Sequence, residues 1–167
     1  MKKFLLMSVV FVMVAAFAQA EPSDVLTPLL TDLNGWKAQK ANGMSMNMAG
    51  MNMLSATREY SKDGKTVSAL IMKGNAAMLM GGAQGMQTMS TETEDAIMNI
   101  KTINGFKVQT VYDKKDGSGV ISVFLTSGRS TGASFSFNYS GISQKEALRL
   151  SKKFDWNKMK SVVGSLK

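Results

Sequence analysis

Cysteine and histidine are absent from the 167-residue sequence, and proline occurs only twice. Without thiols and imidazoles the chain has no disulfide bond, no thiolate or imidazole zinc site, no cysteine nucleophile and no Ser-His-Asp triad. Hydrophobic residues make up 44% and charged residues 19% of the chain, as in an ordinary globular protein. The sequence therefore predicts a folded protein that is not an enzyme, because the side chains most used in catalysis are missing.

The first twenty residues have the order of a secretory signal peptide. Two lysines precede an apolar run over residues 4–17, and the small-residue sequence Ala18-Gln19-Ala20 follows it. A membrane-spanning helix needs about 20 apolar residues, whereas this run has 14. We therefore expect a signal peptide over residues 1–20, a mature single domain over residues 21–167, and a periplasmic or secreted location. An uncleaved membrane anchor is the alternative.

Basic residues outnumber acidic ones in this chain. The sequence has 20 Lys and Arg against 12 Asp and Glu, so loss of Lys2 and Lys3 with the signal peptide leaves 18 against 12, a formal charge of +6. The basic residues are spread along the chain and are not interleaved with aromatic residues, as they are in nucleic-acid platforms. We expect no nucleic-acid partner and, because no second long apolar run follows, no membrane span after signal removal. The oligomeric state stays unknown.

Hydrophobic periodicity and turn residues predict the elements of the mature chain. Pro28, as the first helical residue, begins a short helix that ends at Asn34-Gly35. Asp63-Gly64 joins the strands of a hairpin, and residues 75–89 have helical composition. Further helices begin after the capping residues Ser143 and Asp155. The expected strands are 53–60, 65–73, 98–103, 106–113, 119–126 and 133–139.

This order of elements predicts the α+β class. The expected architecture is an antiparallel sheet, formed by the hairpin and then by a four-strand meander, with helices packed on one face. Such packing hides one apolar face of each element, and the alternation of Phe135, Phe137 and Tyr139 with small polar residues indicates a sheet with one buried face.

Several of these segments together carry a resemblance to a known family. Gly35-Trp36 lies near the mature start, residues 56–60 lead into the Asp63-Gly64 hairpin, and Ile103-Asn104-Gly105-Phe106 precedes the final helix at Ile142-Ser143. With the small-residue segment between them, these features are similar to those of small exported bacterial domains of the PsbP-like kind. The resemblance implies an accessory or binding role and transfers no site residue.

The distinctive feature of the sequence is a methionine motif over residues 44–53, which read Met-Ser-Met-Asn-Met-Ala-Gly-Met-Asn-Met. The two Met-Asn-Met copies mirror each other about the Ala-Gly dipeptide. A two-residue turn at that dipeptide places Met48 opposite Met51 and Met46 opposite Met53. A one-residue bulge in a continuous strand is the alternative, and it also aligns the methionines on one face.

Three roles of the motif are open from the sequence. Thioethers are soft, uncharged ligands that suit Cu(I) in an exported compartment. Methionine is also a flexible apolar filler, so the motif can pack in a half-buried strand or form a soft contact surface. We expect a non-enzymatic exported binding or accessory protein that meets an unknown protein or an apolar ligand through a methionine-rich surface. The alternative is Cu(I) or Ag(I) binding, with the candidate metal ligands Met44, Met46, Met48, Met51 and Met53.

Overall fold

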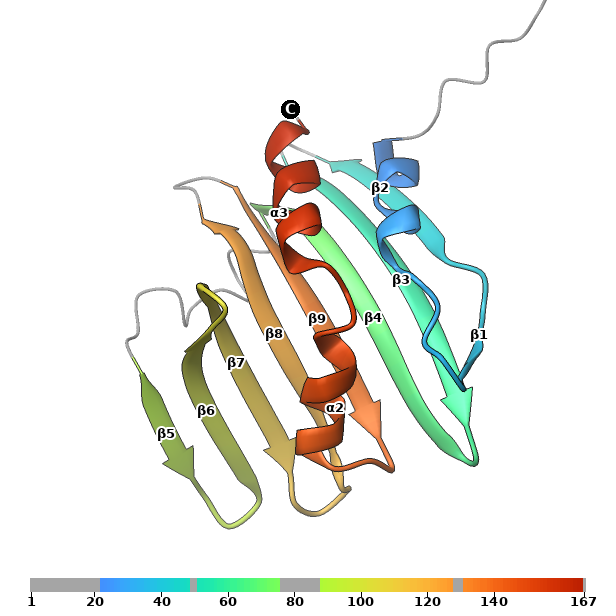
Figure 1. Ribbon diagram of the computed structural model, residues 1–167. Coiled ribbons are helices and arrows are strands. Elements are labelled where there is room, and N and C mark those ends of the chain that lie inside the picture. Colours follow the sequence, from blue (N-terminus) through green and yellow to red (C-terminus); the bar gives the residue numbers. More distant parts are fainter. Residues whose placement is uncertain (1–21, 49–50, 76–87, 128–130, 167) are drawn as a thin grey trace, which may run out of the picture.

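The computed structural model describes residues 22–48, 51–75, 88–127 and 131–166. These residues form nine strands that belong to one antiparallel sheet. Along the sheet the strands follow the order β1-β3-β4-β9-β8-β7-β6-β5. Both β1 and β2 pair with β3. Figure 1 shows β5 at one edge and β1 and β2 at the other. The N-terminal and C-terminal strands form one layer because β4 pairs with the last strand, β9.

Long strands make up the middle of the sheet, and short strands lie at its edges. The bounds are β1 Lys37–Ala38, β2 Asn42–Met48, β3 Met51–Lys62, β4 Lys65–Gly74, β5 Met89–Glu92, β6 Ala96–Ile103, β7 Phe106–Asp113, β8 Ser118–Ser127 and β9 Gly132–Ser140. All six strands expected from the sequence are present, each within two residues of its predicted ends. Alternation and turn residues are local signals, and they located these strands correctly.

In the described ranges, four short helical segments accompany the sheet: the 3₁₀ turns η1 (Pro22–Val25) and η2 (Thr27–Leu29) and the helices α2 (Gln144–Ser151) and α3 (Trp156–Ser165). Both α-helices begin at the predicted caps. The Ser143 hydroxyl accepts from the backbone N–H of Glu146 at 3.2 Å, and the Asp155 carboxylate accepts from that of Lys158 at 2.9 Å. In Figure 1 the two helices lie in front of β8 and β9, whereas β5, β6 and β7 are uncovered in that view.

The α+β class expected from the sequence is wrong. Strands dominate the described residues, and the α-helices among them are two short segments at the C-terminal end rather than a layer of helices packed on one face. The helix expected over 28–34 is only the 3₁₀ turn η2, because Leu30 already leaves helical conformation with φ −90° and ψ 80°. From the sequence, Met89 was expected to end a helix and residues 90–92 to lie in a loop. In the structure these four residues form the edge strand β5.

Two expected segments lie outside the described residues. These are the signal peptide over residues 1–20 and all but the ends of the helix over residues 75–89. Within the part of the chain that the structure describes, no helix is long and apolar enough to cross a membrane.

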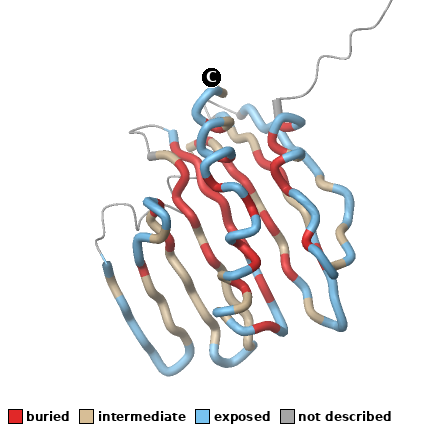
Figure 2. The backbone as a smooth tube through the Cα atoms, in the orientation of Figure 1, coloured by how far each residue is buried: buried red, intermediate tan, exposed pale blue. Residues whose placement is uncertain are grey.

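The main core lies between one face of the sheet and the helical segments. Its buried side chains run from Leu26 in the first residues described to Val163 in α3. Phe154, 2% exposed, is at the centre of an aromatic cluster, with ring centroids 5.2 Å from Phe135, 5.9 Å from Phe137 and 6.1 Å from Tyr60. Figure 2 shows burial concentrated in the central strands and exposure along β5. This face of the sheet is called the core face below.

Two tight turns have the backbone conformation that their sequence predicts. Asp63 and Gly64 have φ values of 49° and 74°, and Asn104 and Gly105 have φ values of 51° and 80°. Positive φ at both central residues is the turn that matches the twist of paired strands. Both hairpins, β3–β4 and β6–β7, are therefore confirmed at their predicted positions.

Gly105 provides a test of this turn with a matched control. A Cβ at Gly105 or at Gly164 of α3 meets nothing within 4 Å, so the two sites differ in backbone conformation and not in space. Gly105→Ala is expected to lower the free energy of unfolding by about 1 kcal/mol, because an L side chain resists positive φ. Gly164→Ala is expected to raise it by about 0.5–1 kcal/mol. Equal shifts in urea denaturation would contradict the assignment of the turn.

Candidate functional site

The methionine motif forms the β2–β3 hairpin. The two strands pair antiparallel, with Met46 opposite Met53 and Met48 opposite Met51. The pairing predicted from the mirrored sequence is therefore confirmed, and the alternative of one continuous bulged strand is wrong. Because strand side chains alternate between faces, the five methionines of the motif occupy register positions on the same side of the sheet. We call this side of the hairpin the methionine face, formed by Met44, Met46, Met48, Met51 and Met53.

The methionine face lies on the opposite side of the sheet from the main core. On β3 the alternate residues Ala56 and Tyr60 are buried in that core, so Met53 and its register neighbours lie on the other side. Met44 is 50% exposed and Met46 is 40% exposed, while Met53 is half-buried. Met44 and Met46 are therefore outside the buried core of the described residues, and the role of the motif stays a prediction.

The methionine face continues toward the middle of the sheet. Ser55 of β3 lies opposite Met44 on one side and opposite Met72 of β4 on the other. Ser55 is 7% exposed and Met72 is 8% exposed. Exposure of this apolar surface is thus greatest on the edge strand β2 and falls toward β4. The methionines at positions 78, 80 and 86, which also contribute to the high methionine content, lie outside the described residues.

Paired thioethers suit soft or apolar ligands. Cross-strand neighbours on one face have Cβ atoms about 4.5–5.5 Å apart, and the unbranched methionine side chain has three rotatable bonds with which to turn its sulfur toward a shared ligand. Among the described residues, no group of three or more His, Cys, Asp or Glu side chains is placed to hold a metal ion. The hairpin therefore offers neutral sulfur donors, which select soft ions such as Cu(I) or Ag(I) over hard cations.

Toward the other end of the strands, the same side of the sheet becomes polar. An open hollow of about 570 Å³ lies there over β3, β4, β9, β8 and β7. Its floor includes a row of hydroxyl groups that are neighbours across four strands: Ser61, Thr66, Ser140 and Ser118. Two carboxylates, Glu59 and Asp113, also line it. Such groups hydrogen-bond polar molecules, and the hollow also has apolar lining residues, among them Val111 and Val120.

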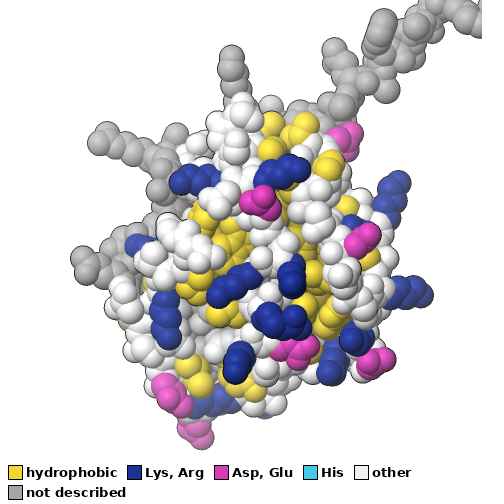
Figure 3. Space-filling view, viewed as in Figure 1, with side chains coloured by type: hydrophobic (Ala, Val, Ile, Leu, Met, Phe, Trp, Pro, Cys, Tyr) yellow, Lys and Arg dark blue, Asp and Glu magenta, His cyan; other side chains and the backbone are white. Residues whose placement is uncertain are grey.

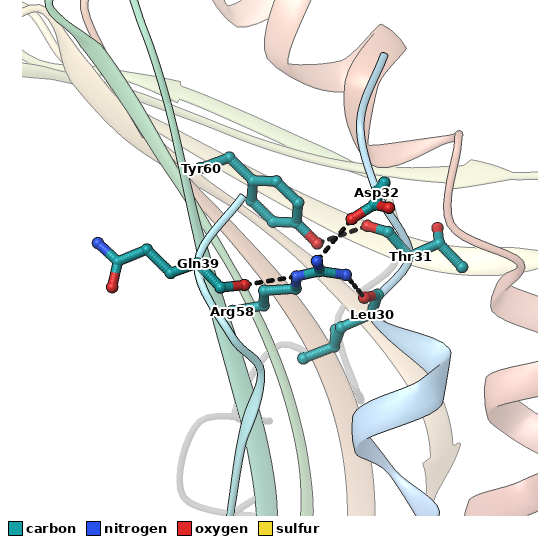
Figure 4. A network of polar contacts seen from close by, with 6 residues as sticks. All are labelled: Leu30, Thr31, Asp32, Gln39, Arg58 and Tyr60. Atoms are coloured by element: carbon teal, nitrogen blue, oxygen red, sulfur yellow. Dashed lines mark hydrogen bonds and ion pairs between the residues drawn. The ribbon is translucent and has the colours of Figure 1, made fainter. Parts of the chain in front are cut away.

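Arg58 organises a polar network on the core face of β3. Its Nε donates to the Gln39 carbonyl at 2.8 Å, its Nη1 to the Leu30 carbonyl at 2.7 Å, and its Nη2 to the Asp32 carboxylate at 2.5 Å. Figure 4 shows the guanidinium between these three acceptors. This network was not predicted from the sequence, because two of the acceptors are backbone carbonyls, which have no sequence signature. The network holds the N-terminal segment and the chain before β2 against β3.

Tyr60 strengthens the same network from two residues further along β3. Its hydroxyl donates to the Thr31 carbonyl at 2.7 Å, and Arg58 Cζ lies 5.6 Å from the centre of its ring. Burial raises the pKa of Tyr60 to about 12, although the positive charge of Arg58 acts in the opposite direction. The phenol therefore stays protonated at neutral pH and keeps its role as a donor. These contacts are structural, and they position the strand that carries Met53.

Comparison of the chain with protein-family models, with characterised proteins and with solved structures found no match. The resemblance to PsbP-like domains therefore stays a prediction.

Proposed function

We propose that the chain is an exported, non-enzymatic binding or accessory protein that uses the methionine face of the β2–β3 hairpin as its binding surface. The observation that carries this proposal is the exposure of Met44 and Met46 on an edge strand. Among the described residues, the exposed large hydrophobic side chains are these two and Val25. Full burial of an exposed methionine contributes about 1.5–3 kcal/mol, and Met44 and Met46 still have 50% and 40% of their surface left to bury in a complex.

The partner is an unknown protein or an apolar ligand that buries the exposed thioethers. Methionine suits such a surface because its side chain is flexible and polarizable and adapts to ligands of different shape. The position of β2 supports the proposal, since an edge strand is accessible from its unpaired side. The contacts of Arg58 and Tyr60 tie the part of β3 just beyond the hairpin to the chain that precedes β2.

Binding of Cu(I) or Ag(I) is the second candidate function, and the strand register favours it. Met46 opposite Met53 and Met48 opposite Met51 form two adjacent cross-strand pairs, which is the arrangement that lets several thioethers converge on one soft ion. The predicted export of the chain agrees with this chemistry. Thioether ligands do not form disulfides in an oxidising compartment, and their donor capacity does not depend on protonation.

Methionine methyl resonances test both candidates directly. The protein is labelled with ¹³C at the methionine methyl groups and titrated separately with Ag(I) and with the uncharged apolar probe Nile red. Shifts of Met44 and Met46 with the apolar probe are expected for a contact surface, and shifts of Met46 and Met53 with Ag(I) for the metal site. Met159, which is fully buried in α3, is the internal control. If neither titrant shifts the hairpin methyl groups, the proposed function is wrong.

Two variants separate the candidates. Replacing Met46, Met48, Met51 and Met53 together by Leu removes the sulfur atoms but keeps the surface apolar. Ag(I) affinity, measured by competition with a chelator, is expected to fall at least tenfold if the sulfurs bind metal, while the apolar probe still binds. Met44→Gln with Met46→Gln is expected to abolish binding of the apolar probe, with the free energy of unfolding changed by no more than about 1 kcal/mol, since both sites are exposed. Met159→Leu is the matched control for loss of a sulfur.

A further inference from the structure

A small groove lies on the core face, beside α2 and away from the methionine face. Its volume is about 230 Å³. The floor consists of two cross-strand pairs of β6 and β7, Asn99 opposite Thr110 and Lys101 opposite Val108. The helix α2 packs on the neighbouring strands β8 and β9. Its side chains therefore form one wall of the groove and do not cover the floor on β6 and β7. Residues that differ by four positions lie on one side of a helix, and the wall accordingly includes both Gln144 and Leu148.

The groove combines an apolar interior with positive charge at its margin. Ile103, Val108 and Leu148 line it and pack on or belong to the main core. Lys101 and Lys145, both exposed, also line it. Its lining residues include no Asp or Glu. Figure 3 shows Lys and Arg side chains gathered over the region of α2 with hydrophobic patches between them. An apolar molecule with one negative end complements this arrangement.

Gln144 adds an unsatisfied donor to the same groove. Its side-chain nitrogen is buried from solvent and has no hydrogen-bond partner among the protein atoms. A buried amide without a partner destabilises the fold, and native proteins rarely leave such a group unpaired. A carboxylate in the groove would interact with the ammonium groups of Lys101 and Lys145 at its margin, and rotation of the Gln144 side chain toward the groove would give its amide an acceptor there. The donor, the two cations and the apolar lining therefore indicate one kind of ligand.

We propose that this groove binds a medium-chain fatty acid, with its alkyl chain on Ile103, Val108 and Leu148 and its carboxylate at Gln144, Lys101 and Lys145. The groove has a volume of about 230 Å³, which limits the ligand to a small molecule rather than a long-chain lipid. A medium-chain fatty acid is such a molecule. This proposal is independent of the methionine face, which lies on the other side of the sheet.

Three probes separate the contributions of the carboxylate and of the alkyl chain to binding. Each is titrated into the full chain and followed by calorimetry and ¹⁵N NMR. Octanoate supplies both the carboxylate and the chain, acetate supplies the carboxylate alone, and octyl glucoside supplies the chain without charge. Octanoate is expected to bind and to shift the side-chain amide signal of Gln144. The other two are expected to bind at least tenfold more weakly. Equal affinity for acetate and octanoate, or no shift of the Gln144 amide signal, would overturn the proposal.

Charge variants provide the matched control. Lys101→Gln with Lys145→Gln is expected to weaken octanoate binding at least tenfold without unfolding the protein, since both side chains are exposed. Lys37→Gln with Lys40→Gln removes the same charge from exposed positions near the opposite sheet edge and is expected to leave the affinity unchanged. Cosedimentation with vesicles of equal parts phosphatidylglycerol and phosphatidylcholine tests whether the protein binds an anionic lipid membrane instead of a free fatty acid. Binding to these vesicles without binding to octanoate contradicts a fatty-acid site.

Discussion

Arg58→Leu is expected to lower the free energy of unfolding by about 3 kcal/mol. The substitution keeps an apolar side chain against Tyr60 and removes three hydrogen bonds from a charged donor, each of which contributes about 1.5–3 kcal/mol when measured alone. It also leaves the carbonyls of Leu30 and Gln39 without the donor that the structure shows for them. Urea denaturation monitored by circular dichroism measures the change.

Two further variants show which of the Arg58 contacts carries the effect. Asp32 is 78% exposed at its side chain, so Asp32→Asn is expected to cost less than about 1 kcal/mol, as exposed ion pairs do. Arg58→Lys keeps the charge but loses the planar fork that reaches three acceptors, and a loss of about 2 kcal/mol is expected. If Asp32→Asn is as damaging as Arg58→Leu, the ion pair and not the pair of backbone carbonyls holds the N-terminal segment.

The network also bears on the binding surface, because Gln39 lies three residues before β2 begins. The bond from Arg58 to the Gln39 carbonyl and the backbone bond from the Gln39 N–H to the Glu59 carbonyl, at 2.9 Å, fix the chain where it enters the hairpin. The methionine hairpin is therefore connected to a strand end that these contacts hold in place. Loss of Arg58 is expected to broaden the methyl resonances of Met44 and Met46 more than that of Met159.

Features that depend on neighbouring residues in the sequence were predicted well. The Asp63-Gly64 and Asn104-Gly105 turns follow from the positive φ that these residue types tolerate. The Ser143 cap follows from a hydroxyl placed one residue before a helix. The methionine register follows from two mirrored copies about a dipeptide, so the residues of the candidate site and their pairing were available from the sequence.

Features that depend on distant residues were not predicted. The partners of Arg58 lie 19 to 28 positions away, and no local pattern links an arginine to backbone carbonyls. The pairing of β4 with β9 joins segments on either side of the middle of the chain and makes one large sheet from elements that the sequence divides into a hairpin and a meander. The exposure of Met44 also depends on the sheet, because the motif alone fits a buried or an exposed strand equally well.

The structural role of Gly119 could not be predicted from the sequence either, because it depends on the side chains and backbone of the neighbouring strands. Gly119 lies opposite Tyr139 on β9 and Tyr112 on β7. A Cβ at this glycine would lie 2.4 Å from the Tyr139 hydroxyl oxygen and 2.4 Å from the Val111 carbonyl oxygen. Gly119 therefore leaves the space that the Tyr139 side chain occupies. The Tyr139 hydroxyl is itself buried without a hydrogen-bond partner, and burial raises its pKa to about 12.

Gly119→Ala is accordingly expected to lower the free energy of unfolding by about 3 kcal/mol, at the upper end of the range for overpacked cores. Tyr139→Phe alone is expected to be neutral or to stabilise the fold by up to about 1 kcal/mol, because it removes a buried hydroxyl that has no partner. The double variant is expected to recover only part of the loss, since the Val111 carbonyl is backbone and still opposes the new Cβ. Thermal and urea denaturation of the three variants measure these effects. Full recovery in the double variant would show that the Tyr139 hydroxyl alone excludes a side chain at position 119, and an unchanged stability of Gly119→Ala would contradict the close packing of β7, β8 and β9 at this point.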